Sequence, residues 1–312
     1  LTLITIRCFN QFGELMKNLL QCSIFVTLEN QLIDIAERIK SAKVVHLMAP
    51  ADVEGVLSLS QIESALLDNS QNYLRRILPP RKHVSHENKE NIPEVEGLIV
   101  HISPFHETQS AIRIDKDYIQ IFPISVSLNF PNSSKTHNGA VDCVALSAAL
   151  AGILSPEGAR VRKQRPMAMA GNWLRNGADA NYDPVFSILR DHLDSEGSIE
   201  IRPLPEVNSP DVSMIPGLSK MMLNRLQKSW PKMDVEQRSS AISELVLPSL
   251  RLDGISTMRL EELVWHRAII PGNDVDIASQ LHTAQGLWPG EEVEAKVHAS
   301  NILDGLIKNG HF

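Results

Sequence analysis

Two acidic residues, Asp52 and Glu54, stand where a loop could carry out metal-assisted chemistry on a phosphate. They follow the apolar residues 44–48, which predict a short strand. In open α/β sheets, functional groups usually lie in loops beyond the carboxyl ends of the strands. Two carboxylates on such a loop can hold one or two divalent cations, which polarise a phosphate and lower the pKa of a bound water.

The same two residues also have a structural interpretation. The apolar residues after the loop recur at the spacing of one helix face, at Leu59, Ile62 and Leu66. Asp52 can therefore cap a helix that begins near Gly55, and Glu54 can interact favourably with the N-terminal dipole of that helix. Capping and metal binding are compatible, so both interpretations stay open.

A local run of cations is a candidate contact for a nucleic-acid backbone. The run consists of Arg160, Arg162, Lys163 and Arg165. With Arg175 it forms the candidate nucleic-acid-binding set, although a solvated loop explains the run almost as well. Trp173 is placed to stack on a base, whereas burial between layers is the commoner role of a tryptophan.

The composition narrows the class of protein. A chain of 312 residues is long enough for two domains with their own cores. The formal net charge of -7 lacks the basic excess of proteins that bind DNA tightly and independently of sequence, although a local basic groove remains compatible with it. The cysteines Cys8, Cys22 and Cys143 are odd in number and lack metal-ligand spacing, which favours buried thiols in a reducing cytosol.

The sequence contains no run of about 20 apolar residues, the length that spans a bilayer. Its beginning also lacks the cationic and apolar regions of a signal peptide. We therefore expect a cytoplasmic protein that does not contact membranes. Because the first residue is Leu rather than Met, we also expect that the chain is a fragment or was cut at its start.

The elements that would position the acidic pair follow from hydrophobic periodicity. Helical spacing is present just before residue 44 and again over residues 61–77. Residues 97–103 and 118–128 are rich in β-branched side chains and predict strands buried on both faces. Residues 139–154 are apolar on nearly all sides and predict a helix packed between layers. Strands separated by helices predict an α/β fold, with a parallel sheet flanked by helices.

Proline-rich and polar segments separate these elements. Residues 78–97 predict an exposed loop, in which His83, His86 and Lys89 are more simply solvated than a metal or phosphate patch. Residues 195–218 predict an interdomain linker. Helices are expected beyond it, at about residues 219–230, 235–250, 259–270, 274–287 and 291–308. We predict an α/β domain over residues 1–195 and a linker with a helical region over residues 196–312.

The order of these segments resembles the DHH phosphoesterase superfamily, and within it the archaeal RecJ-like nucleases. That family begins with a strand, an Asp-x-Asp-x-Asp-Gly loop and a helix, to which PADVEG followed by VLSLSQIESAL is similar. Its later elements have counterparts in LIVHIS, IQIFPI, LNFPNSS with GAVDCVALSAALAG, MAMAGNWLRNGAD and MIPGL. The resemblance covers roughly residues 31–271. It implies a DHH domain for residues 1–195, then a helical connector and a DHH-associated second domain that is truncated or absent.

Carried over residue by residue, the resemblance implies a degenerate site. In the first loop the leading acid of the family falls on Pro50, the second is kept as Asp52, and the third is replaced by Glu54. The acid of the second strand falls on His101. A hydrolytic two-metal site needs several anionic oxygens, so the resemblance implies either no cofactor or a weakly bound Mn²⁺ or Mg²⁺ on Asp52, Glu54 and His101.

The later motifs depart further from the family pattern. The Asp-His-His triplet falls on Phe122, Pro123 and Ile124, and the last acid falls on Arg175 or Asn176. In a shifted register Asp179 or Asp183 would supply the last acid, and His106 would supply a histidine. Even that set would hold only one metal weakly.

The leading hypothesis is a catalytically impaired RecJ-like protein, a pseudoenzyme that acts as a scaffold in DNA replication or repair. It follows by analogy with the cell-division-cycle subunit of the eukaryotic replicative helicase, which resembles RecJ in fold without its nuclease site. The expected partners are GINS-like and MCM-like replisome proteins and single-stranded DNA. The alternative is an active metal-dependent DHH phosphoesterase, a single-stranded-DNA exonuclease. A third hypothesis is a generic α/β domain with an accidental resemblance.

Overall fold

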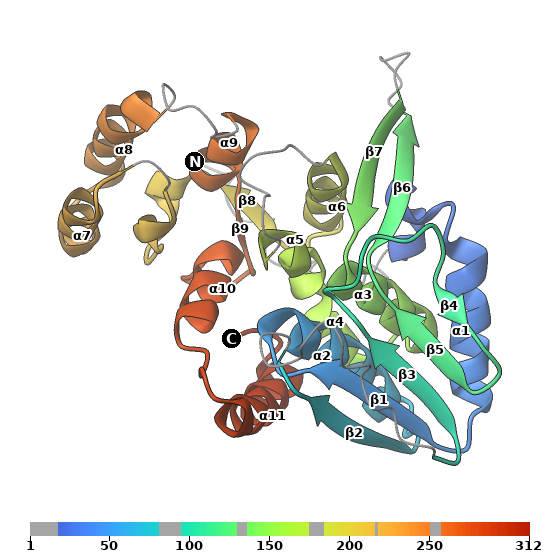
Figure 1. Cartoon of the computed structure of the whole chain (residues 1–312). Helices are drawn as coiled ribbons and strands as arrows, with labels where there is room; N and C mark the ends of the chain where they lie inside the picture. Colours follow the sequence, from blue (N-terminus) through green and yellow to red (C-terminus); the bar gives the residue numbers. More distant parts are fainter. Residues whose placement is uncertain (1–17, 81–94, 130–135, 175–183, 216–217, 250–256) are drawn as a thin grey trace, which may run out of the picture.

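The computed structural model describes residues 18–80, 95–129, 136–174, 184–215, 218–249 and 257–312 (Figure 1). Within these ranges the largest sheet has the strand order β2-β1-β3-β5-β4. Its strands are β1 (Val45–Pro50), β2 (Tyr73–Leu78), β3 (Leu98–Ile102), β4 (Arg113–Ile114) and β5 (Tyr118–Ile121). β2, β1, β3 and β5 are parallel, and β4 is antiparallel to β5. This mostly parallel sheet with flanking helices confirms the predicted α/β class.

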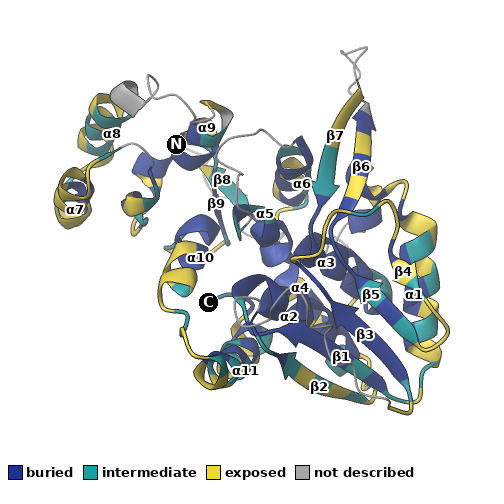
Figure 2. Ribbon diagram, in the orientation of Figure 1, coloured by how far each residue is buried: buried dark blue, intermediate teal, exposed yellow. Residues whose placement is uncertain are grey.

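Helices α1 (Glu29–Ser41), α2 (Val53–Asp68) and α3 (Cys143–Leu154) lie behind the sheet in Figure 1. The sheet faces them with alternate side chains, such as Leu47 of β1 and Val100 of β3, which belong to the main core. α2 is buried on all sides, because the sheet, α3, the short helix α4 (Ala159–Gln164) and the C-terminal helix α11 (Glu292–Asn309) surround it. Figure 2 shows its ribbon as buried.

The opposite face of the sheet carries a second, smaller apolar cluster. It consists of Met48, Leu78 and Ile99, with Tyr118 packed against them. Strand side chains alternate between faces, so this cluster uses the positions that α2 and α3 do not cover.

Three predicted elements are divided differently in the structure. The helix predicted over residues 139–154 begins only at Cys143, and residues 139–141 belong to strand β7 (Thr136–Val141). Residues 118–128 form two strands rather than one, because the chain leaves the sheet at Pro123, which has no N–H for the ladder. The second piece, β6 (Ile124–Asn129), pairs with β7 as an antiparallel hairpin. The helical spacing predicted over residues 61–77 ends at Asp68, and residues 73–78 form β2, along which half-buried and exposed side chains alternate up to Ile77.

The segment predicted as an interdomain linker contains a strand and buried apolar side chains. Residues 195–218 contain β8 (Glu200–Arg202), which pairs with β9 (Arg267–Ile269), and the side chains of Leu204, Val207 and Val212 are buried. β9 occupies the end of the helix predicted over residues 259–270, so helix α9 (Thr257–Trp265) is shorter than expected. The remaining helices are α5 (Ala170–Leu174), α6 (Pro184–Ser195), α7 (Lys220–Ser229), α8 (Val235–Ser249) and α10 (Ile277–Gly286).

The last two helices return to the α/β layer. α10 packs against α2 and α5, and α11 packs against α2, α4 and β2. The buried face of α11 consists of Ala295, Ala299, Leu303 and Leu306, which belong to the same core as the sheet. The boundary predicted between residues 195 and 196 stays a prediction. None of the helices in the described ranges combines the length and the apolarity that crossing a bilayer requires.

Candidate functional site

The loop after β1 is a tightly packed junction between a strand and a helix. Asp52 is the N-cap of α2, and its side chain accepts a hydrogen bond of 2.8 Å from the Gly55 amide. A Cβ atom on Gly55 would lie only 2.4 Å from the carbonyl oxygen of Pro50, so this position has room only for glycine. The capping role predicted for Asp52 is therefore confirmed. Pro50 ends β1 opposite Leu78, and the next amide, that of Ala51, donates to the Leu78 carbonyl.

A distant part of the chain lies against this loop. The indole Nε1 of Trp288, between α10 and α11, donates a hydrogen bond of 2.9 Å to the Ala51 carbonyl. The Trp288 ring in turn meets the His298 ring edge-on, with 4.8 Å between centroids. The loop that the sequence marks as a metal site is thus joined to the C-terminal helix.

Glu54 lies in the first turn of α2, two residues after the cap, and only 6 % of its surface is exposed. A carboxylate in the first turn interacts favourably with the helix dipole. The two acids of the predicted site are therefore both within one helical turn, on the side of the sheet that α2 covers.

His101 does not join the two acids. It is buried in β3, and it follows Ile99 by two residues, which places it on the face of the smaller apolar cluster, away from α2. Its Nδ1 lies 2.8 Å from the Tyr118 hydroxyl and its Nε2 lies 3.3 Å from the Ser103 hydroxyl. Because Gln120 Nε2 donates to that Ser103 oxygen, the serine hydrogen can point to His101 Nε2, which leaves Nδ1–H to donate to Tyr118. Both ring nitrogens are then engaged within the sheet.

The described residues contain no group of three or more His, Cys, Asp or Glu side chains that could hold a metal ion. Asp52, Glu54 and His101 are accordingly not gathered into one set of ligands. Of the shifted-register candidates, His106 stacks on Phe122, with 5.1 Å between ring centroids. Asp179, Asp183 and Asn176 lie outside the described residues, as do His83, His86 and Lys89.

A further acid, Asp142, was not singled out from the sequence. It is buried at the end of β7 and caps α3, because its Oδ1 accepts a hydrogen bond of 2.9 Å from the Ala145 amide. Gly171 of α5 lies against it, since a Cβ atom there would be 2.2 Å from Asp142 Oδ1. Gly171 is helical, and close packing against Asp142 requires a glycine there. The signal was available, because an Asp directly before the apolar run 143–154 is a typical N-cap.

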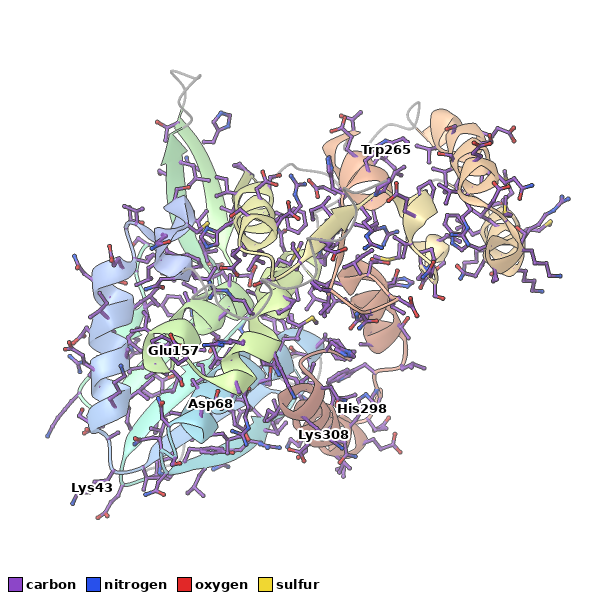
Figure 3. The ribbon with its side chains drawn as sticks, turned by 180° about the vertical axis from the view of Figure 1, so that it is seen from behind. Lys43, Asp68, Glu157, Trp265, His298 and Lys308 are labelled. Atoms are coloured by element: carbon purple, nitrogen blue, oxygen red, sulfur yellow. The ribbon has the colours of Figure 1, made fainter. Side chains whose placement is uncertain are left out.

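The predicted basic set is mostly occupied by protein partners. Arg160 forms an ion pair with Asp68 at 2.9 Å, and Arg162 forms one with Glu157. Lys163 Nζ donates a hydrogen bond of 3.2 Å to the Lys308 carbonyl in the last turn of α11. Figure 3 labels Asp68 and Glu157 beside α4, and Lys308 on α11. These contacts tie α4 to α2 and α11.

Arg165 is a correction to the predicted set. Its side chain is 2 % exposed and forms a bidentate pair with Glu196, at 2.7 Å and 2.9 Å. A guanidinium buried in this way cannot face a nucleic-acid backbone, because its charge already balances a buried carboxylate. Arg175 lies outside the described residues.

Trp173 is buried rather than available to stack on a base. It is 8 % exposed and meets the Phe186 ring edge-on at 5.4 Å. The Arg259 guanidinium lies 3.9 Å above its ring. This packing joins α5, α6 and α9.

Comparisons with known proteins give a limited result. No family model and no curated protein matches the chain. Among solved structures, the chain is similar to RecJ from Thermus thermophilus, crystallised in complex with Mn²⁺, with 11% sequence identity and a TM-score of 0.31. The match covers 89% of this chain but only 37% of that chain, so the chain spans little more than a third of the RecJ structure. Membership of the DHH superfamily therefore stays a prediction.

Proposed function

We propose that this chain is a non-catalytic binding module with a DHH-like α/β fold, which acts as a scaffold in a DNA replication or repair complex. The observation that carries the proposal is the structural use of the acidic loop. Asp52 caps α2, and Trp288 holds the adjacent carbonyl of Ala51. The candidate metal ligand His101 lies on the other face of the sheet and is bound to Tyr118.

The partners follow from the resemblance alone. We propose GINS-like and MCM-like replisome proteins as the proteins that the scaffold joins, with single-stranded DNA as a further ligand. Binding of each purified partner to the chain can be measured by calorimetry. Absence of binding to both proteins would remove this part of the proposal and leave the question of catalysis untouched.

The first experiment tests catalysis. Calorimetric titration of Mn²⁺ into the purified chain is paired with an assay of cleavage of labelled single-stranded DNA. We expect neither tight Mn²⁺ binding nor cleavage. Cleavage that Asp52→Ala and Asp52→Ser both abolish would overturn the proposal in favour of a metal-dependent exonuclease, because serine keeps the helix cap but supplies no carboxylate.

A further inference from the structure

A cationic surface on α7 lies outside every site considered above. The segment 220–232, KMMLNRLQKSWPK, contains four cations and no acid, in a chain whose net charge is -7. Lys220, Arg225, Lys228 and Lys232 are all exposed, and none of them forms an ion pair within the part of the chain that the structure describes. Arg160, Arg162 and Arg165, which the sequence suggested instead, all have carboxylate partners.

The side chains of this surface share one face of the helix. Met221, Asn224, Arg225, Lys228 and Ser229 of α7, with Lys232 of the short 3-10 helix that follows, line a shallow hollow of about 500 Å³. The spacing of three or four residues keeps the α7 side chains in one stripe, roughly 12 Å long from Met221 to Ser229 at 1.5 Å per residue. Figure 1 shows α7 at the outer end of the molecule, and Figure 2 shows its surface as largely exposed.

The opposite face of α7 is firmly held. Leu223, Leu226 and Trp230 are buried, and Trp230 Nε1 donates 3.0 Å to the Val207 carbonyl. Gln227 accepts from the Val212 amide and donates to the Pro210 carbonyl. The stripe is therefore presented on an anchored helix, which lowers the conformational cost of binding.

We propose that the α7 stripe is a docking surface for an acidic, amphipathic segment of another protein. The unpaired cations would bind carboxylates, and the exposed Met221 would contact an apolar side chain placed among them. Met221 is 81% exposed, and methionine suits surfaces that accept varied apolar partners. Single-stranded nucleic acid fits less well, because such ligands stack on aromatic side chains, whereas the aromatic residue of this segment, Trp230, faces the core.

This inference rests on the proposed binding role, but its test does not involve the acidic loop. A labelled synthetic helix with Leu on one face and Glu on the other is titrated into the full chain, and its fluorescence anisotropy is measured at low and high salt. Two analogues, with Glu replaced by Gln or Leu replaced by Ser, and an oligothymidine serve as comparison ligands. Failure here leaves the Mn²⁺ and cleavage results unchanged, so the two proposals can fail separately.

The decisive variant is the double charge reversal Arg225→Glu/Lys228→Glu. Its matched control is Lys43→Glu/Lys116→Glu, which makes the same change in net charge at two exposed, unpaired lysines of the α/β layer. We expect the α7 reversal to weaken peptide binding about tenfold or more, and the control to retain it. Met221→Ser should weaken binding without changing its salt dependence.

Three results would overturn the inference. Equal loss in both reversals would show binding by net charge alone. Preference for the oligothymidine would assign the stripe to nucleic acid. Concentration-dependent self-association of the wild type, removed by the α7 reversal, would assign it to a second copy of the chain.

Discussion

At the scale of single residues, Asp52 and Arg165 each have a residue type that suits either ligand binding or a structural role. Asp52 is acidic and precedes a helix, and the structure uses it as an N-cap on the Gly55 amide. Arg165 belongs to a basic run, yet it balances the buried Glu196. Which role a residue takes depends on its burial and on its partner. The local sequence does not reveal either, since a carboxylate on an exposed loop and one that accepts from a helix amide have the same neighbours in sequence.

The capping role of Asp52 predicts a difference between two substitutions. Asp52→Ala removes the acceptor for the Gly55 amide and should lower the free energy of unfolding by about 1 kcal/mol. Asp52→Ser keeps an oxygen at that place and should be close to neutral. Denaturant unfolding of both variants gives the comparison. Equal destabilisation would mean that the carboxylate charge, and not the cap, stabilises this loop.

At the scale of elements, the junctions around α2 determine how the site is built. β1 leads into α2 through Pro50 and Gly55, which are in near contact. Further along α2, the buried Glu63 accepts two hydrogen bonds from β2. One comes from the Tyr73 hydroxyl at 2.7 Å and the other from Arg75 Nη2 at 2.6 Å. Arg75 also bonds to Asp304 of α11 at 2.8 Å. A strand and two helices from distant parts of the chain thus share one polar cluster.

The β1–α2 junction predicts that Gly55→Ala is destabilising. Its Cβ would meet a backbone oxygen, which cannot rotate away, so we expect a loss of about 1–3 kcal/mol despite the better helix propensity of alanine. The matched control is Gly305→Ala in α11, where nothing lies within 4 Å of the added Cβ. That variant should gain up to about 1 kcal/mol. Thermal or denaturant unfolding shows whether each variant is less or more stable than the wild type.

The Glu63 cluster predicts a loss of stability at alkaline pH. Burial, followed by the hydrogen bond to Glu63, raises the pKa of Tyr73 from 10.0 to about 12. Because the folded-state pKa lies above the unfolded one, the contribution is fully present below pH 10 and is lost as the pH rises toward 12. The unfolding free energy of the wild type should therefore fall more steeply than that of Tyr73→Phe over this interval. If the unfolding free energies of the two proteins fell in parallel with pH, the raised pKa of Tyr73 would be contradicted.

At the scale of the whole molecule, the return of α11 to α2 makes the first and last parts of the chain depend on each other. Leu303 is fully buried within the same core as the sheet. Trp288, just before α11, bonds to the loop after β1. Changes in α11 should consequently be felt in the α/β layer and in the candidate site.

Leu303→Ala should lower the unfolding free energy by about 2–5 kcal/mol, because it leaves a cavity between α11 and α2. Val297→Ala, at a position of α11 that is 59% exposed, is the matched control and should stay within about 0.5 kcal/mol. Far-ultraviolet circular dichroism and tryptophan fluorescence should report one coincident transition. Separate transitions would show that α11 unfolds independently of the α/β layer.

The amino-acid sequence by itself determined the α/β class, the strand before Asp52, the cap of α2 and most of the helix predicted over residues 139–154, whose first residues, 139–141, instead end β7. These features depend on periodicity and on neighbours within a few residues, which a sequence displays directly. The tertiary structure alone decided that residues 73–78 form a strand beside β1, that His101 binds Tyr118 and that Arg165 is buried against Glu196. It also brought Trp288 to Ala51. Each of these contacts joins residues that are far apart in the chain, and their burial depends on which elements pack together rather than on any local pattern.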